Sequence, residues 1–319
     1  MTHELRRHER IVALSGGVGG AKLAEGLMRA VVEGEMTLVV NTGDDFNHLG
    51  LHVCPDVDTA LYTLSGLANP QTGWGRRDET WSFMQALEQF GGESWFRLGD
   101  ADLALHVERT RRLAAGEPLS SVISDLAERL AIPARILPMS DDPVRTRLDT
   151  EIGALDFQHY FVREQCRPRV NSIEFKGAEK ARLSPGAVRA LADEDLGAII
   201  LCPSNPYLSI APMLAVPRMR ELIRSADVPV VAVSPLVGGE AVKGPTTKIM
   251  NELGLSVSVL QIVQDYADLI DGLVLDSRDA GLRDRIDLPV TVTDTLMHTP
   301  QDRLRVARET LAFAATLRG

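Results

Sequence analysis

An apolar run that breaks into four glycines and then resumes as an amphipathic segment constrains the fold of this chain more than any other feature. It occupies residues 11–23, IVALSGGVGGAKL. The apolar run predicts a strand, the glycines a tight turn, and the following segment a helix beginning near Ala21. Glycines let backbone N–H groups approach an anion closely, and the positive end of the helix dipole points to the same place. We therefore expect a phosphate at this loop. The residues that would hold it are Gly16, Gly17, Gly19 and Gly20.

The loop matches neither of the two common nucleotide-binding fingerprints. The dinucleotide motif has a third glycine where this chain has Lys22, and the P-loop has Gly-Lys-Ser/Thr where this chain has Ala-Lys-Leu. A tight turn of an α/β domain without a ligand therefore remains an alternative for the glycines taken alone. The same mismatch disfavours an NAD-dependent oxidoreductase. Lys22 itself becomes a candidate phosphate contact.

Further short apolar runs indicate an α/β fold. A β-branched run at residues 37–40 follows the first strand after a helix of about 15 residues, which is the spacing of a βαβ unit. Strands that are buried on both faces read as continuous apolar runs, and the later runs have this character. They lie at residues 134–138, 197–202, 229–234, 272–276 and 289–293. We expect a Rossmann-like, mostly parallel sheet with helices on both faces, ending in a helix over residues 300–317.

The composition of the chain changes between its first strands and its last ones. Residues 61–181 contain all three tryptophans, helical patterns at 103–113 and 119–130, and an alternating hairpin at 144–157. We therefore predict a polar tail at residues 1–10, a Rossmann-like core at 11–60 and 182–319, and a largely helical insertion at 61–181 over the active-site crevice.

Charge and cysteine content exclude several classes of function. The net charge of -10 disfavours binding to nucleic acid, which requires a basic surface. Three cysteines without a CxxC pair or a matching histidine spacing predict neither a zinc site nor a disulfide framework. Because the first ten residues lack the apolar region of a signal peptide and no later apolar run has the length of a membrane span, we expect a cytoplasmic protein.

Carboxylates follow the second predicted strand and begin the next predicted helix. Asp44 and Asp45 come directly after the strand, and Asp58 lies near the start of the helix. Ligands of open α/β sheets bind at the carboxyl ends of the strands, so these acids and the glycine loop should share one crevice. Carboxylates beside a bound phosphate suit Mg²⁺, and we predict that all three bind the metal and act in catalysis. Alternatively, Asp58 only caps its helix and Asp44 only shapes a turn.

Three other polar positions are candidates for substrate contacts. Arg97 lies in a compact polar turn from which a guanidinium can hold a heterocycle or a phosphate. Ser204 and Asn205 follow a predicted strand and can contact a base or ribose. Each also fits ordinary turn chemistry, and His106 is more typical of a satisfied helix histidine. No hydrolase triad is visible. A phosphate loop together with acids favours transfer of a phosphorus-centred group.

Seven motifs occur in the order seen in the 2-phospho-L-lactate transferase family, which this chain resembles over nearly its whole length after residue 10. They are SGGVGGAK (15–22), NTGDD (41–45), PDVDT (55–59), LGDAD (98–102), LPMSDD (137–142), SNP (204–206) and SPL (234–236). The glycine loop alone is also kept by a paralogous branch of the same fold. A nucleotide-binding regulator without deazaflavin transferase activity is therefore the alternative.

The resemblance implies a specific reaction. A guanosine diphospho-linked donor would transfer 2-phospholactate, phosphoenolpyruvate or 3-phosphoglycerate to the ribityl hydroxyl of 7,8-didemethyl-8-hydroxy-5-deazariboflavin. GMP would leave, and the product would be a precursor of coenzyme F-420. The resemblance also implies a requirement for Mg²⁺ and a homodimer.

The resemblance further implies roles for individual residues. Asp58 and Arg97 would contact the deazaflavin, while Asp44 and Asp45 would lie at the metal and the reacting phosphate. The loop at residues 16–22 would hold the guanosine diphosphate part together with Ser204 and Asn205. From the sequence we expect Asp58→Ala to abolish transfer and to leave the fold intact.

Overall fold

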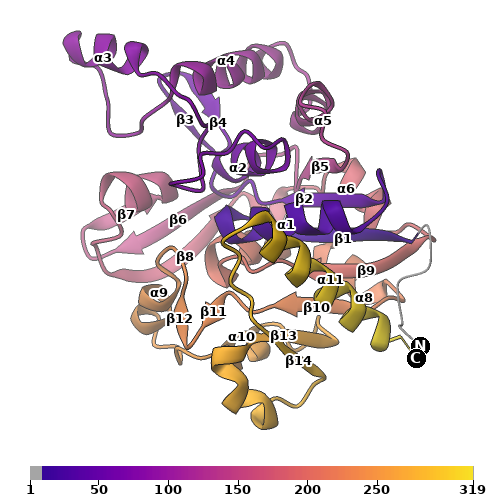
Figure 1. The fold of residues 1–319 in the computed structure, drawn as a ribbon. Helices are drawn as coiled ribbons and strands as arrows, with labels where there is room; N and C mark the ends of the chain where they lie inside the picture. Colours follow the sequence, from indigo (N-terminus) through magenta and orange to yellow (C-terminus); the bar gives the residue numbers. More distant parts are fainter. Residues whose placement is uncertain (1–8, 319) are drawn as a thin grey trace.

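Seven parallel strands form one sheet in the computed structural model, which describes residues 9–318 (Figure 1). The strand order is β5–β2–β1–β9–β10–β13–β14, and every neighbouring pair is parallel. The strands are β1 (Arg10–Ser15), β2 (Met36–Val40), β5 (Arg135–Pro138), β9 (Leu196–Leu201), β10 (Val230–Val233), β13 (Gly272–Asp276) and β14 (Val290–Thr293). The α/β class and all seven predicted strands are confirmed. Most of the predicted polar tail, residues 1–8, lies outside the described residues.

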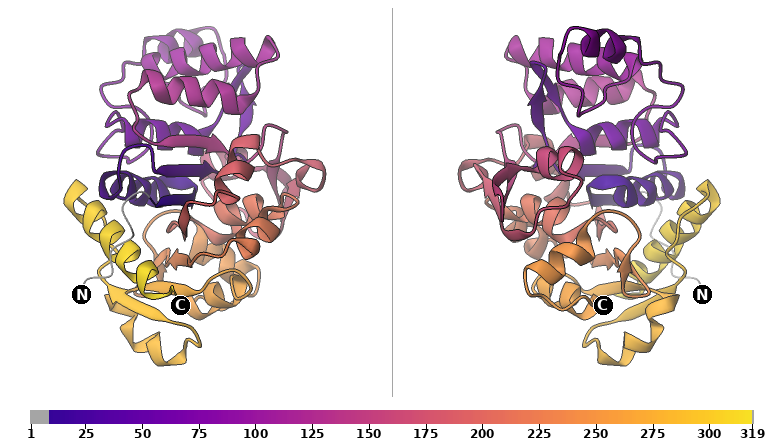
Figure 2. Two further views of the ribbon diagram at one scale, coloured as in Figure 1. Left: turned by 90° about the vertical axis from the view of Figure 1, so that its right-hand side faces the viewer. Right: turned by 90° about the vertical axis from the view of Figure 1, so that its left-hand side faces the viewer.

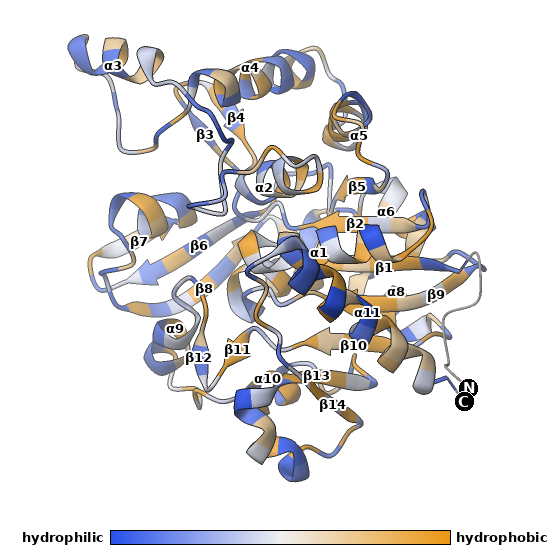
Figure 3. Cartoon of the chain, in the orientation of Figure 1, coloured by the Kyte–Doolittle hydropathy of each residue, from blue (hydrophilic) through white to orange (hydrophobic). Residues whose placement is uncertain are grey.

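Helices cover both faces of this sheet, because alternate residues of each strand point to opposite sides. In β1, Ile11 and Ala13 belong to one buried apolar cluster, whereas Val12 and Leu14 belong to another. The first cluster is completed by α1 (Gly17–Ala30), α2 (Pro55–Leu64), α5 (Leu119–Arg129) and α11 (Pro300–Thr316). The second is completed by α6 (Pro185–Leu191), α7 (Ala211–Ala215), α8 (Met219–Ser225) and α10 (Val259–Asp265). The two side views in Figure 2 show these layers, and Figure 3 shows the apolar strands between them.

The remaining elements surround the sheet. They are α3 (Ser82–Gln89), α4 (Asp100–Ala114), α9 (Thr246–Glu252), the hairpins β3 (Phe46–His48) with β4 (Leu51–Val53) and β11 (Leu236–Val237) with β12 (Glu240–Ala241), and the antiparallel sheet of β7 (Gly153–Asp156), β6 (Arg145–Thr150) and β8 (Val170–Lys176). Short helical turns lie at η1 (His159–Arg163), η2 (Ala178–Lys180), η3 (Pro206–Ile210) and η4 (Ser277–Arg285). The predicted hairpin at 144–157 is confirmed as β6 and β7, whereas the β3–β4 hairpin was not predicted. Strand β5 falls within the range predicted as the insertion, yet it is the edge strand of the main sheet.

The strand order reverses direction between β1 and β9. From β1 the sheet grows to one side through β2 and β5, and to the other through β9 and the later strands. Loops that leave the carboxyl ends of two such strands diverge, and open α/β sheets bind ligands in the crevice between them. The loops in question begin at Gly16 and Cys202.

Among the described residues, none of the helices combines the length and the apolar character needed to cross a membrane.

Candidate active site

The glycine loop packs directly on the loop that follows β9. Helix α1 begins at Gly17, four residues before the predicted start, so three of the four glycines lie in its first turn. Gly17 has a φ of +67°, a left-handed conformation that glycine adopts without strain. The Gly16 N–H donates to Ser204 Oγ at 3.0 Å. A Cβ added at Gly19 would lie 2.6 Å from the Pro203 carbonyl oxygen, so glycine is needed here for contact between the two loops.

We expect Gly19→Ala to separate the two loops, because the new methyl group meets backbone rather than a flexible side chain. Forced overpacking of this kind costs about 1–3 kcal/mol of stability. Urea denaturation would measure the loss of stability, and calorimetry would measure the change in nucleotide affinity. Gly281→Ala is the matched control, since a Cβ there has nothing within 4 Å and the residue is not at positive φ. Equal stability and equal nucleotide affinity in both variants would show that the contact with Pro203 is unimportant.

The N-terminus of α1 already has a carboxylate from the chain itself. Asp56 Oδ1 accepts a hydrogen bond from the Gly17 N–H at 2.8 Å. Asn41 Nδ2 donates to Asp56 Oδ2 and to Asp44 Oδ1, both at 3.0 Å. Burial raises the pKa of Asp56 to about 6. The sequence interpretation missed Asp56, although it is the first acid of the PDVDT motif and lies in the first turn of α2.

Asp44 and Asp45 are adjacent in sequence but have different surroundings. Asp44 accepts the hydrogen bond from Asn41, and burial, together with the negative charge of Asp56, raises its pKa well above the usual range. Asp45 is only 2% exposed, and neither of its carboxylate oxygens has a hydrogen-bond partner. It lines a hollow of about 260 Å³ together with Thr42 and His52, whose Oγ1 and Nε2 are also buried and unpartnered. Buried polar groups are nearly always hydrogen-bonded, so this concentration of exceptions marks a place for a ligand.

Asp58 is held in a buried ion pair. Arg109 Nη1 and Nη2 donate to its two carboxylate oxygens at 2.6 and 3.0 Å. The Arg109 side chain is completely buried, and its Nη2 also lies 2.7 Å from His106 Nδ1. His106 Nε2 lies 3.2 Å from Asp102 Oδ2. Asp58 therefore helps to attach α4 to α2, and its predicted part in catalysis and metal binding stays a prediction.

The other predicted substrate contacts have partners within the chain. Asn205 Oδ1 accepts from the N–H groups of Tyr207 and Leu208, which caps η3. Lys22 Nζ donates to the Met297 carbonyl at 2.8 Å, and burial lowers the pKa of this lysine. The guanidinium of Arg97 lies 4.2 Å from the centre of the Trp81 ring.

Five aromatic rings form a cluster, and two of them closely follow Asp45 in the sequence. Phe46 and His48, on β3, pack with two other rings at centroid distances of 4.8–6.0 Å, and a fifth ring packs on one of those two at 4.7 Å. The other members are Trp95, Phe96 and His159. The hairpin that positions Asp45 thus also carries two rings of this aromatic cluster, and one of the three tryptophans belongs to it. Trp74, by contrast, is 57% exposed.

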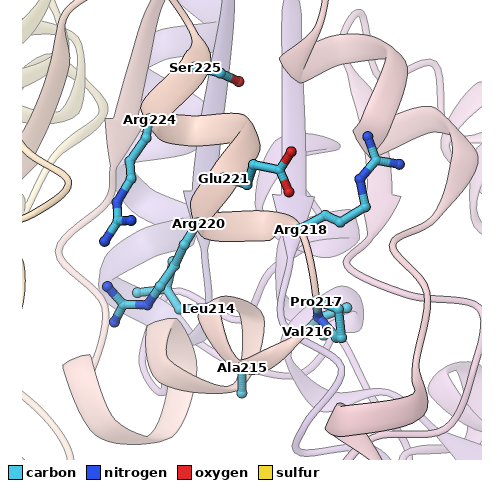
Figure 4. Close-up of a pocket in the computed structure, with 9 residues that line it drawn as sticks. All are labelled: Leu214, Ala215, Val216, Pro217, Arg218, Arg220, Glu221, Arg224 and Ser225. Carbon is cyan, nitrogen blue, oxygen red and sulfur yellow. The ribbon is translucent and has the colours of Figure 1, made fainter.

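A larger hollow of about 620 Å³ at α7 and α8 is a poorer candidate for the active site. Figure 4 shows the side chain of Arg218 pointing away from those of Arg220 and Arg224. Arg220 and Arg224 are paired with Asp268. Ligand sites have a few convergent polar groups, and the two arginines that converge here do so on Asp268.

Comparisons with known proteins show the family and the fold of this chain. The family model described as 2-phospho-L-lactate transferase CofD matches residues 11–298. A phosphoenolpyruvate transferase of Streptomyces griseus is 40% identical, covering 97% of this chain and 99% of that protein. A 2-phospho-L-lactate transferase of Methanopyrus kandleri is 39% identical over the same shares. A crystal structure of a UPF0052 family member from Bacillus halodurans has the same fold, with a TM-score of 0.61, 15% identity, and coverage of 95% of this chain and 98% of that one.

Proposed function

This chain belongs to the 2-phospho-L-lactate transferase CofD family of coenzyme F-420 biosynthesis, and we propose that it uses a guanosine diphospho-linked donor. The phospho-three-carbon acid passes to 7,8-didemethyl-8-hydroxy-5-deazariboflavin, and GMP is released. The full-length similarity to transferases at about 40% identity is the observation that carries this proposal. These relatives carry the names of both phosphoenolpyruvate and 2-phospho-L-lactate transferases, so the test compares the donors.

The loops at the reversal point of the sheet provide the donor side of the proposed site. Asp56 takes the Gly17 N–H, and the other N–H groups in the first turn of α1 face a diphosphate together with the positive end of the helix dipole. Lys22 lies on this helix, and its pKa is lowered by burial and then by the charges of Arg303 and Lys243, so two further cations lie near Lys22. Two nearby cations favour an anion, and the diphosphate of the donor is the anion we propose for this position.

Mg²⁺ fits the donor set at the acidic end of the site. Hard divalent cations bind carboxylate oxygens, and both oxygens of Asp45 are buried without a partner. We assign Asp45 as the main protein ligand of Mg²⁺, with Asp44 and Asp58 as further members of the acidic group. The ion would shield the negative charge that develops on the transferring phosphoryl group.

The chain's own residues supply the rest of the proposed chemistry. Asp44 is suited to accept the proton of the attacking hydroxyl, because a raised pKa makes a carboxylate a better base. The half-buried ring of Trp95 offers an aromatic contact for the deazaflavin, with Arg97 and Asp58 as the proposed polar contacts. A homodimer and a cytoplasmic location stay predictions.

Purified protein incubated with the deazaflavin, each of the three donors and Mg²⁺ should release GMP with at least one donor. Removal of Mg²⁺ with a chelator should abolish this release, and added Mg²⁺ should restore it. Chromatography of GMP and of the deazaflavin product measures both. Failure with all three donors would overturn the proposal. If tryptophan fluorescence then responded to nucleotide but not to deazaflavin, the chain would be a nucleotide-binding regulator.

A further inference from the structure

We propose that Asp45, His52 and Cys54 form a binding site for one divalent cation of the zinc class. The β3–β4 hairpin brings the three residues together. Its register pairs Phe46 with Val53, and continuing this register by one step places Asp45 opposite Cys54. His52 and Cys54 are two positions apart, so a strand carries them on the same face. One ligand atom from each of the three residues lies within 4.8 Å of the other two.

The spacing of the ligand atoms suits a tetrahedral ion better than it suits a hydrogen bond. His52 Nε2 lies 3.4 Å from Asp45 Oδ2, and neither atom has a hydrogen-bond partner. Two ligands bound to zinc at about 2.0–2.2 Å in a tetrahedron are roughly 3.3–3.6 Å apart. The observed separation therefore places an ion between the imidazole and the carboxylate with little movement of either side chain.

Independent features of the pocket also indicate a ligand. Thr42 Oγ1 is buried, unpartnered and part of the lining of the same 260 Å³ hollow as Asp45 and His52. The hollow gives an ion a route to the site, and the completely buried Cys54 lies behind it. The backbone of His52 is fixed by α4, because its N–H donates to Thr110 Oγ1 at 2.8 Å and its carbonyl accepts from Arg109 Nε at 3.1 Å.

The chemistry of the donors selects the class of metal. A thiolate, an imidazole and a carboxylate are typical ligands of zinc, whereas Mg²⁺ takes oxygen ligands almost exclusively. A carboxylate and a thiolate carry two negative charges, which balance a divalent cation. The nearby Arg109 is already paired with Asp58. The cysteine spacing does not reveal this site, because only one cysteine takes part and the carboxylate comes from the other side of the hairpin.

Binding of zinc at this site would occupy the carboxylate that we assign to Mg²⁺. We therefore expect zinc to inhibit Mg²⁺-supported transfer, and this expectation rests on the proposed function. The proposal that zinc binds does not rest on the proposed function, because zinc binding can be measured without substrates.

Titration of the metal-free protein with Zn²⁺, against a chromophoric chelator, tests the site. We expect one zinc ion per chain, and with Co²⁺ a thiolate-to-cobalt charge-transfer absorption. Cys54→Ser should abolish the absorption and lower zinc affinity at least tenfold, and Cys166→Ser is the thiol control that should change neither. His52→Gln should also lower zinc affinity, and it carries the test if circular dichroism shows that Cys54→Ser is unfolded.

Wild-type protein that gives no thiolate-to-cobalt absorption, or folded variants that bind zinc as tightly as wild type, would overturn the site. These results are separate from the test of function. Protein that transfers with Mg²⁺ but binds no zinc contradicts only this inference, and protein that binds zinc but releases no GMP contradicts only the proposed function. If the zinc site and the transfer activity are both correct, zinc should inhibit GMP release by wild type and Cys166→Ser but not by folded Cys54→Ser.

Discussion

Asp45→Asn is expected to lower kcat for transfer by about a hundredfold to a thousandfold, which corresponds to roughly 3–4 kcal/mol of transition-state stabilisation. The amide keeps the shape of the side chain but removes the negative charge that we assign to Mg²⁺. The fold should not suffer, because both carboxylate oxygens are buried without a hydrogen-bond partner and the charged group is costly where it lies. GMP release over a range of Mg²⁺ concentrations and urea denaturation measure the two effects.

The combination of lost activity and retained stability is the informative result for Asp45. Asp149→Asn makes the same chemical change at an exposed position on β6 and should alter neither quantity. If Asp45→Asn transferred at a rate close to that of wild type at every Mg²⁺ concentration, Asp45 would not be the metal ligand. If it lost stability instead, the carboxylate would have a structural role, with His52 Nε2 at 3.4 Å as its partner.

The fold could be predicted because its signals are local. The inner strands of the main sheet are buried on both faces, so each appears in the sequence as a short continuous apolar run, as in Leu196–Leu201. The β3–β4 hairpin was missed for the opposite reason. Its strands have three residues each, and their character comes from packing against α4 and the aromatic cluster rather than from a repeating pattern.

The candidate site was only partly predictable, because long-range partners decide what each acid does. The sequence identified the acidic segments but could not distinguish Asp45, which has no hydrogen-bond partner, from Asp44, which is hydrogen-bonded to Asn41. It also could not show that Asp56 caps the glycine helix. The bond from Asn41 to Asp44 lies within one motif, whereas the contact of Asp56 with Gly17 joins residues 39 positions apart, which no local motif encodes.

The largest such difference concerns Asp58, and it changes the expected result of Asp58→Ala. Arg109 is completely buried and is held by both carboxylate oxygens of Asp58. Removing one member of a buried ion pair leaves the other charge uncompensated and costs about 3–5 kcal/mol. We therefore expect Asp58→Ala to be strongly destabilised in urea, in contrast to the intact fold expected from the sequence. Loss of transfer in this single variant would say nothing about chemistry.

A double variant separates the structural role of Asp58 from its proposed contact with the deazaflavin. Asp58→Leu with Arg109→Met replaces the ion pair by apolar side chains, and such replacements of buried pairs are often neutral or stabilising. We expect the double variant to regain most of the stability that Asp58→Ala loses, yet to release GMP at less than about a hundredth of the wild-type rate, a loss of roughly 3 kcal/mol in transition-state binding. A stable double variant with normal transfer would assign Asp58 to the fold alone. A double variant as unstable as Asp58→Ala would show instead that its destabilisation does not come from the unpaired charge of Arg109.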